Sequence, residues 1–195
     1  MNGVIIVDKP NDAETIWKDA VATLHGATRR TEITLTEFPA PNRLAPYALA
    51  LSGVLTNNTE EELSSGRFVL LHDPSGQPTW DGEFRIVTFV NADIEADVVT
   101  DEMFDEVAWS WLLECLAKSE AEYGALSGTV TRTVSRSFAD LADRARQTQL
   151  EIRASWTPGS EQLAAHLTAW CSLLEQSAGL EPLPDGVTQI SRNKQ

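Results

Sequence analysis

The sequence predicts an α+β domain in which an antiparallel sheet of about five to six strands has helices packed on one face. Three observations predict this class. Strand-like segments occur in runs instead of alternating with helices. Two strongly apolar segments, 66–73 and 82–90, flank a turn that contains Pro and Gly, as in a hairpin with a longer connection. Three further segments repeat apolar residues at helical spacing, and they fall before, between and after the strand runs.

Each expected helix combines an apolar stripe with a local start or stop signal. The first is expected over residues 11–26, and the second over roughly 101–123, where a wide apolar stripe follows an acidic start. The third is expected to begin at Pro158, because proline suits the first helical position, and to end at Gly179. We expect strands in the remaining apolar or alternating segments, which are 31–38, 47–55, 66–73, 82–90, 128–138 and 149–156.

The expected elements fit one domain. Their order is helix, three or four strands, helix, two strands and helix, which resembles the order of the small acidic secretion-chaperone-like fold (helix, three strands, helix, two strands, helix). The 195 residues suit a single α+β domain over 1–188, and we expect 189–195 to form a flexible tail.

The segment GTVTRTVSRSF, residues 128–138, places a hydroxyl on every second residue. In a strand these hydroxyls share one face, and the opposite face mixes apolar residues with Arg132 and Arg136. We expect the hydroxyl face to be solvated and the neighbouring strand to be 149–156. The two arginines then lie either at the rim of the sheet or against carboxylates of a helix laid across it.

Charge and composition narrow the classes of function. The formal net charge of −14 repels phosphate and argues against a nucleic-acid partner. The two cysteines, Cys115 and Cys171, lie on expected helices among apolar residues, as buried thiols of a reducing compartment do. No segment approaches the roughly 20 apolar residues of a membrane span, and the N-terminal apolar run of four residues is too short for a signal peptide. We therefore expect a cytoplasmic protein with no membrane partner.

A series of separated motifs runs through most of the chain: APYALALSG, GRFVLLHDPSGQPTWDGEFRIVTFVNADIE, AWSWLLECL, SGTVTRTVSRSF, EIRASWTP, and AWCSLL followed by PLPDGV. On these motifs the chain resembles the actinobacterial domain-of-unknown-function family 3000 over about residues 30–188. The resemblance implies a small soluble bacterial protein with no assigned activity, and it brings no catalytic residue to this sequence.

His72 and Asp73 are the pair that looks most like a catalytic or ligand-binding site. They end a strong strand at a turn, where functional groups often gather, and Trp80 follows across the turn. A histidine beside a carboxylate suits acid–base chemistry or ligand binding. The alternative is that Asp73 accepts a backbone hydrogen bond in an Asx turn and that His72 lies on the surface.

The start of the second expected helix is a candidate surface for a protein partner. Its carboxylates suit a basic partner or a hard cation, or they are plain solvated charge. Trp109 and Leu113 fall away from the main apolar stripe of this helix, so an exposed pair there would indicate a partner or dimer interface. The candidate residues are Trp109, Leu113, Asp101, Glu102, Asp105 and Glu106.

Arg132, Arg136 and Arg153 are a candidate anion or RNA patch, since guanidinium and hydroxyl groups are good phosphate partners. The net charge and the lack of stacking aromatic residues on the same face argue against high affinity. The histidines and cysteines lack the spacing of metal ligands, and no nucleotide-binding, dinucleotide-binding or serine-esterase motif occurs. We therefore expect no cofactor and no metal.

These features together favour an acidic, non-enzymatic interaction protein, an adaptor or chaperone-like regulator that binds a protein partner, and homodimerisation stays open. Two alternatives remain. One is a small-molecule-binding protein or enzyme with a site near His72 and Asp73, and the other is an RNA-associated factor that uses the Arg132, Arg136 and Arg153 surface.

Overall fold

The computed structural model describes residues 12–41, 43–94, 101–141, 143 and 147–180. The N-terminal apolar run and the expected tail at 189–195 lie outside these residues. None of the described helices is long and apolar enough to cross a membrane. In chain order the elements are α1 (Asp12–Thr23), η1 (Leu24–Gly26), β1 (Ile33–Phe38), β2 (Tyr47–Thr56), β3 (Glu62–Gln77), β4 (Gly82–Asp93), α2 (Phe104–Lys118), β5 (Tyr123–Ser135), η3 (Ala139–Leu141), β6 (Gln147–Pro158) and α3 (Ala164–Ser177).

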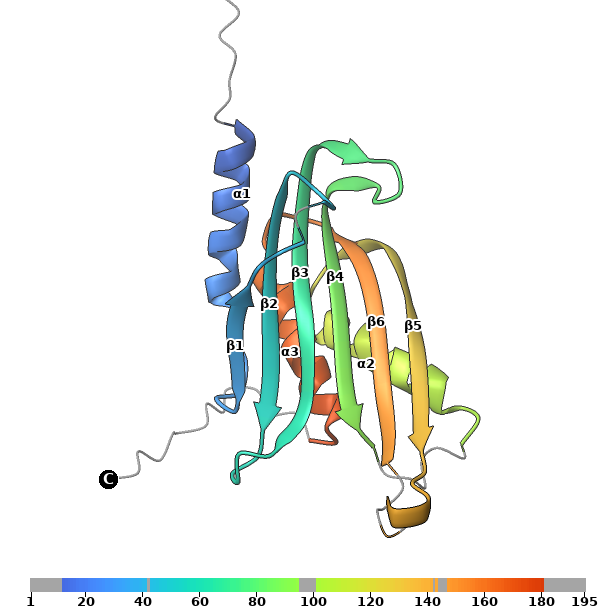
Figure 1. The fold of residues 1–195 in the computed structure, drawn as a ribbon. Helices are drawn as coiled ribbons and strands as arrows, with labels where there is room; N and C mark the ends of the chain where they lie inside the picture. The colour runs from blue at the N-terminus through green and yellow to red at the C-terminus, as the bar shows by residue number, and fades with distance from the viewer. Residues whose placement is uncertain (1–11, 42, 95–100, 142, 144–146, 181–195) are drawn as a thin grey trace, which may run out of the picture.

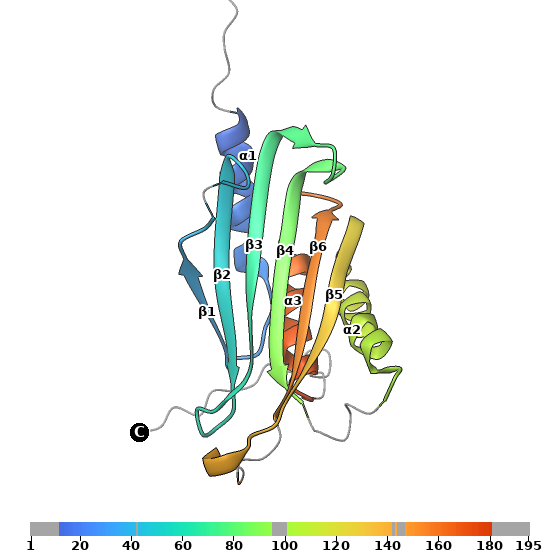
Figure 2. The ribbon, with the colours of Figure 1, turned by 45° about the vertical axis from the view of Figure 1, so that its right-hand side comes forward.

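The described strands form one antiparallel sheet with the order β1-β2-β3-β4-β6-β5. Figure 1 shows α2 and α3 behind this sheet, and Figure 2 shows α1 on the same side. The predicted α+β class, an antiparallel sheet with helices on one face, is therefore confirmed. Four strands precede α2, one more than in the secretion-chaperone-like order.

The alternation of side chains gives the sheet two different faces. One face carries large apolar residues that pack against the helices and form the core with buried residues of α2 and α3. Members of this core that are fully buried are Phe68, Leu70, Ile86, Val90, Leu150, Ile152 and Trp156. The opposite side of the same strands is the open face, and its central residues are Ser52, Arg67, Phe89, Arg153 and Thr129, which lie side by side across five strands.

Two glycines let α3 lie close to the sheet. Gly53 and Gly66 are directly opposite each other on β2 and β3. A Cβ atom on Gly53 would lie 2.6 Å from Cη2 of Trp170, and one on Gly66 would lie 3.0 Å from Cζ2 of the same ring. The fully buried Trp170 ring therefore occupies space that any other residue on these strands would fill.

The element boundaries differ from the sequence prediction at both ends of the helices that neighbour the β5–β6 ladder. The third helix begins at Ala164 and not at Pro158, because Pro158 ends β6 opposite Tyr123 and belongs to the sheet. The strand predicted at 128–138 already begins at Tyr123, and α2 ends earlier than predicted, at Lys118. In both places the long β5–β6 ladder includes residues that local signals assigned to helices or their ends.

Candidate binding groove on the open face

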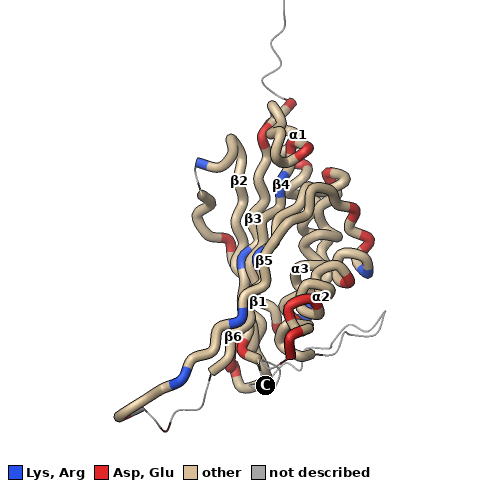
Figure 3. The backbone as a smooth tube through the Cα atoms, turned by 90° about the vertical axis from the view of Figure 1, so that its right-hand side faces the viewer, with Lys and Arg blue, Asp and Glu red and all other residues tan. Residues whose placement is uncertain are grey.

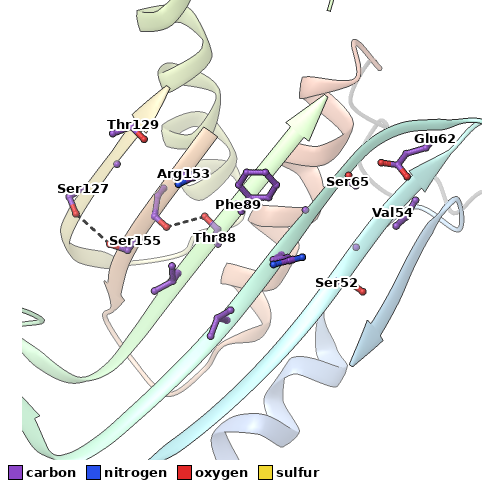
Figure 4. A pocket seen from close by; sticks show the side chains of 17 residues that line it. Ser52, Val54, Glu62, Ser65, Thr88, Phe89, Ser127, Thr129, Arg153 and Ser155 are labelled. Atoms are coloured by element: carbon purple, nitrogen blue, oxygen red, sulfur yellow. Dashed lines mark hydrogen bonds between the residues drawn. The ribbon is translucent and has the colours of Figure 1, made fainter. Parts of the chain in front are cut away.

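A groove of about 850 Å³ crosses the open face of the sheet. It runs from β2 to β5, over four strand-to-strand intervals, which corresponds to about 19 Å. Figure 4 shows side chains of all these strands around it, with Ser52 and Val54 at one end and Ser127 and Thr129 at the other. The lining residues include Ser52, Val54, Glu62, Ser65, Arg67, Val69, Val87, Phe89, Ser127, Thr129, Arg153 and Ser155.

The floor of the groove is apolar. Val69 and Val87 are directly opposite each other on β3 and β4, and Val54 on β2 and Phe89 on β4 are further apolar lining residues. Val87 is 37% exposed, although it lies in the centre of the sheet. Central strands of a sheet usually bury such residues, so an uncovered apolar floor marks a place where another molecule can gain contact area.

Two arginines flank the aromatic residue of this floor. Arg67 on β3 is directly opposite Phe89 on β4, and Phe89 is directly opposite Arg153 on β6. The guanidinium carbon of Arg153 lies 5.6 Å from the centre of the Phe89 ring, while that of Arg67 leans away over Phe38. Arg153 Nε also lies 2.7 Å from the Glu151 carboxylate, in a pair whose arginine side chain is 65% exposed and whose glutamate side chain is 29% exposed.

A buried arginine supports the polar end of the groove. Arg85 is only 7% exposed, and its guanidinium donates to the carbonyls of Ala125 and Ser155 and, at 2.7 Å, to the Ser155 hydroxyl. Burial lowers the pKa of Arg85, and among the described residues no carboxylate pairs with it. Ser155 Oγ accepts from Arg85 and lies 3.4 Å from Ser127 Oγ, and either of these two hydroxyls can be the donor of that contact.

The charges of the molecule are unevenly distributed. Figure 3 shows many acidic positions on α1 and α2 and in the segments beside them, and basic positions on several strands as well as on the helix side. In the groove itself the charged lining residues are Glu62, Arg67 and Arg153. The groove lining therefore carries two arginines and one carboxylate on a protein whose net charge is −14, and the Arg153 guanidinium is in contact with Glu151.

The structure places the predicted His72 site away from this groove. His72 is fully buried on the helix side of β3, where its ring stacks on Phe84 with centroids 4.2 Å apart. Neither ring nitrogen of His72 has a hydrogen-bond partner in the described part of the chain, and the Glu83 carboxylate, at 3.7 Å, is too distant for one. Burial lowers the pKa of His72, which favours the neutral ring.

The hydrogen bonds of Asp73 and Trp80 go to residues other than His72. Asp73 Oδ1 accepts from the Ser75 backbone N–H at 3.1 Å, so the Asx-turn interpretation of Asp73 is confirmed. The accompanying expectation of a surface His72 is wrong, since this ring is buried. Trp80 is also buried, and its carbonyl accepts from the Thr157 hydroxyl.

The expected partner surface on α2 is partly used inside the molecule. Trp109 is half-buried and not exposed, and its ring lies over β5, where a Cβ on Gly128 would approach it to 2.7 Å. Leu113 is half-buried too. Asp105 binds Arg132, and the Asp101 carboxylate accepts from the Met103 backbone N–H, while Glu102 and Glu106 are exposed. A protein partner at this surface stays a prediction.

The three arginines of the predicted anion patch do not form one stripe. Arg132 lies on the helix side of β5, where its Nε is 2.7 Å from Asp105, as one of the two sequence-based alternatives predicted. Arg136 follows the end of β5 and lies over the Phe138 ring. Arg153 lies on the open face beside Phe89. The expectation of a shared Arg132, Arg136 and Arg153 surface is therefore wrong.

The sequence analysis missed Arg67 and Phe89, although a signal for them was present. In both 66–73 and 82–90 an alternating pattern places large apolar residues on one face, and Arg67 and Phe89 fall on the other. An aromatic residue on the polar face of a strand is the feature that points to a binding surface.

Among the described residues no group of three or more His, Cys, Asp or Glu side chains could hold a metal ion.

Comparison with known proteins agrees with the sequence motifs. No curated protein and no solved structure matches the chain. The model of one protein family, described as protein of unknown function (DUF3000), matches residues 13–188. The chain therefore belongs to the DUF3000 family.

Proposed function

We propose that this protein is a non-enzymatic binding protein that holds an amphipathic organic anion on the open face of its sheet. The observation that carries the proposal is the row Arg67, Phe89 and Arg153, which places an aromatic side chain between two arginines on adjacent strands. The apolar part of the ligand would cover Val87 and Phe89, and its charged group would pair with the guanidinium groups.

The size and charge of the groove favour a small ligand over a nucleic acid. A volume of about 850 Å³ falls in the usual range of small-molecule sites. A single charged group meets the local field of Arg67 and Arg153, whereas an extended polyanion would also meet the repulsion of the whole acidic molecule. The Arg153 side chain is 65% exposed, so its guanidinium group is accessible to a ligand while it contacts Glu151.

The residues of the groove support binding more than acid–base catalysis. Its titratable lining residues are Glu62, Arg67 and Arg153, and none of them is a histidine or a cysteine. Proton transfer at neutral pH is efficient with groups whose pKa lies near 7. Hydroxyls such as Ser155 and Ser127 can instead orient an anion by hydrogen bonds.

Two fluorescent probes test the proposal. The anion 8-anilinonaphthalene-1-sulfonate and the neutral N-phenyl-1-naphthylamine have the same aromatic rings and differ in the sulfonate. We expect the anion to bind the full chain more tightly, and Arg153→Gln to weaken it about tenfold, which corresponds to about 1.4 kcal/mol for a charge-assisted contact. Phe89→Ala is expected to weaken both probes.

Arg136→Gln is the matched control, because it removes the same charge from an arginine outside the groove. Fluorescence titration measures each dissociation constant. Equal binding of the two probes, or equal effects of Arg153→Gln and Arg136→Gln, would refute an anion-selective groove.

A further inference from the structure

A second feature of the sheet is independent of the groove floor. In the described part of the chain β5 is an edge strand, because it pairs with β6 on one side and is the last strand of the sheet. A bulge interrupts the ladder between Gly124 and Ser127, so the regular part of this edge runs from Ser127 to Ser135. An edge of this length presents a row of backbone N–H and C=O groups to any strand that approaches it.

The two edges of the sheet differ in how they resist such pairing. β1 has six residues, includes Glu37 and is followed by Pro39, and short length, charge and proline all hinder the addition of a strand. The regular part of β5 has no proline and a single charged residue, Arg132. That charge is neutralised within the chain, since Arg132 contacts both oxygens of the Asp105 carboxylate, at 2.7 and 3.1 Å.

The side chains of this edge are self-complementary. The hydroxyl residues of this edge all point to the open face, and for those within 128–138 the sequence predicted a shared face; they are Ser127, Thr129, Thr131, Thr133 and Ser135. If two copies of β5 paired antiparallel with Thr131 opposite itself, Thr129 would lie opposite Thr133, and Ser127 opposite Ser135. Threonine and serine pairs across antiparallel strands are favourable.

The helix side of β5 fits the same arrangement. Pairing about Thr131 places Val134, which is 46% exposed in the single chain, opposite Gly128 of the second copy. Figures 1 and 2 show α2 extending past β5 at one end of the helix, on the side away from the open face. Met103 and Val107, at the start of α2, are 62% and 43% exposed. A second sheet added at β5 would cover part of this apolar surface.

We propose that β5 pairs antiparallel with β5 of a second copy of this chain, about a two-fold axis at Thr131. The product is a symmetric dimer with one continuous sheet, because the same strand supplies both sides of the contact. Since each groove reaches Ser127 and Thr129, the two grooves of the dimer would lie next to each other on one open face.

Cysteine substitutions test the pairing and its register. We expect Thr131→Cys to form an intermolecular disulfide under mild oxidation, because the two copies of residue 131 are opposite each other. Thr129→Cys and Thr133→Cys should not cross-link alone, as their copies lie more than 7 Å apart, yet a mixture of the two should. Cys115 and Cys171 do not interfere, since both are buried and burial raises each thiol pKa to about 12. Cross-linking of Thr129→Cys alone, or none in any sample, would overturn the proposal.

Light scattering during size-exclusion chromatography tests the dimer in the unmodified chain, with an expected mass of twice 21.4 kDa. The double variant Thr131→Lys, Thr133→Lys should give the mass of one chain, because it places like charges across the axis. The matched control Thr34→Lys, Thr36→Lys adds the same charges to exposed positions on the other edge strand and should leave the dimer intact. A monomeric unmodified chain, or dissociation by the β1 lysines and not by the β5 lysines, would overturn the proposal.

Discussion

Protonation of His166 is expected to destabilise the folded protein. This histidine is buried at the start of α3, and the indole Nε1 of Trp156 donates a hydrogen bond to its Nδ1 at 3.1 Å. Nδ1 can accept that bond only without a proton of its own. Burial lowers the pKa of His166 to about 4. Adding a proton would place a second donor against the indole N–H and a charge among apolar residues.

The direction of the effect follows from the two states of the chain. In the unfolded chain His166 has an ordinary pKa near 6.5, so it takes up a proton as the pH falls below that value, while the folded state stays neutral to about pH 4. The contribution of His166 to the free energy of unfolding is therefore fully present above about pH 6.5, and it is lost as the pH falls from about 6.5 to about 4. The loss from pH 7 to pH 5 amounts to about 2 kcal/mol, and the complete loss to about 3 kcal/mol.

The contribution of His166 is measured by comparing the original chain with His166→Asn. Both proteins are unfolded with urea at pH 7 and at pH 5, and unfolding is followed by tryptophan fluorescence. The asparagine oxygen can accept from Trp156 in place of Nδ1, and it does not titrate. We expect the free energy of unfolding of the original chain to fall about 2 kcal/mol further than that of the variant. His72 is present in both proteins, so its contribution cancels. Parallel pH profiles of the two proteins would refute the assigned role of His166.

Two further substitutions test the packing below and beside the groove, both by urea unfolding at pH 7. Gly53→Ala places a Cβ 2.6 Å from the Trp170 ring and should cost about 1–3 kcal/mol, whereas the control Gly124→Ala, which meets nothing within 4 Å, should change stability by less than about 1 kcal/mol. Arg85→Met should lower the free energy of unfolding by about 2 kcal/mol, because it removes the donors to two carbonyls and to the Ser155 hydroxyl. A Gly53→Ala variant as stable as Gly124→Ala, or a neutral Arg85→Met, would contradict these contacts.

The sequence was sufficient for the fold class because the relevant signals are local. Apolar runs and period-two alternation identified the strands, and the hydroxyl ladder of 128–138 correctly predicted which side of β5 faces away from the helices. The third helix was placed too early because Thr157 and Pro158 are good helix starters. Their position in the structure is decided by the ladder with Tyr123 and Gly124, more than thirty residues earlier in the chain.

The site could not be predicted to the same extent, because it depends on which strands become neighbours. The row of Arg67, Phe89 and Arg153 exists because β4 pairs with β3 on one side and with β6 on the other. No local pattern specifies that β6, and not β5, lies beside β4. The error at His72 has a different cause: its even-numbered position shares the face of Phe68 and Leu70, so the alternation itself placed the ring in the core despite the nearby turn.

Three glycines on the helix side of the strands explain why the helices lie on one side of this sheet and leave the other uncovered. A helix packs closely where a strand offers space, and Gly53, Gly66 and Gly128 supply that space to Trp170 and Trp109 on the helix side. On the open face the neighbouring positions carry Arg67 and Arg153, whose long charged side chains would have to be desolvated beneath a permanent helical cover. A thin ligand with its own negative charge avoids that cost, because it covers the apolar floor and pairs with the guanidinium groups at once.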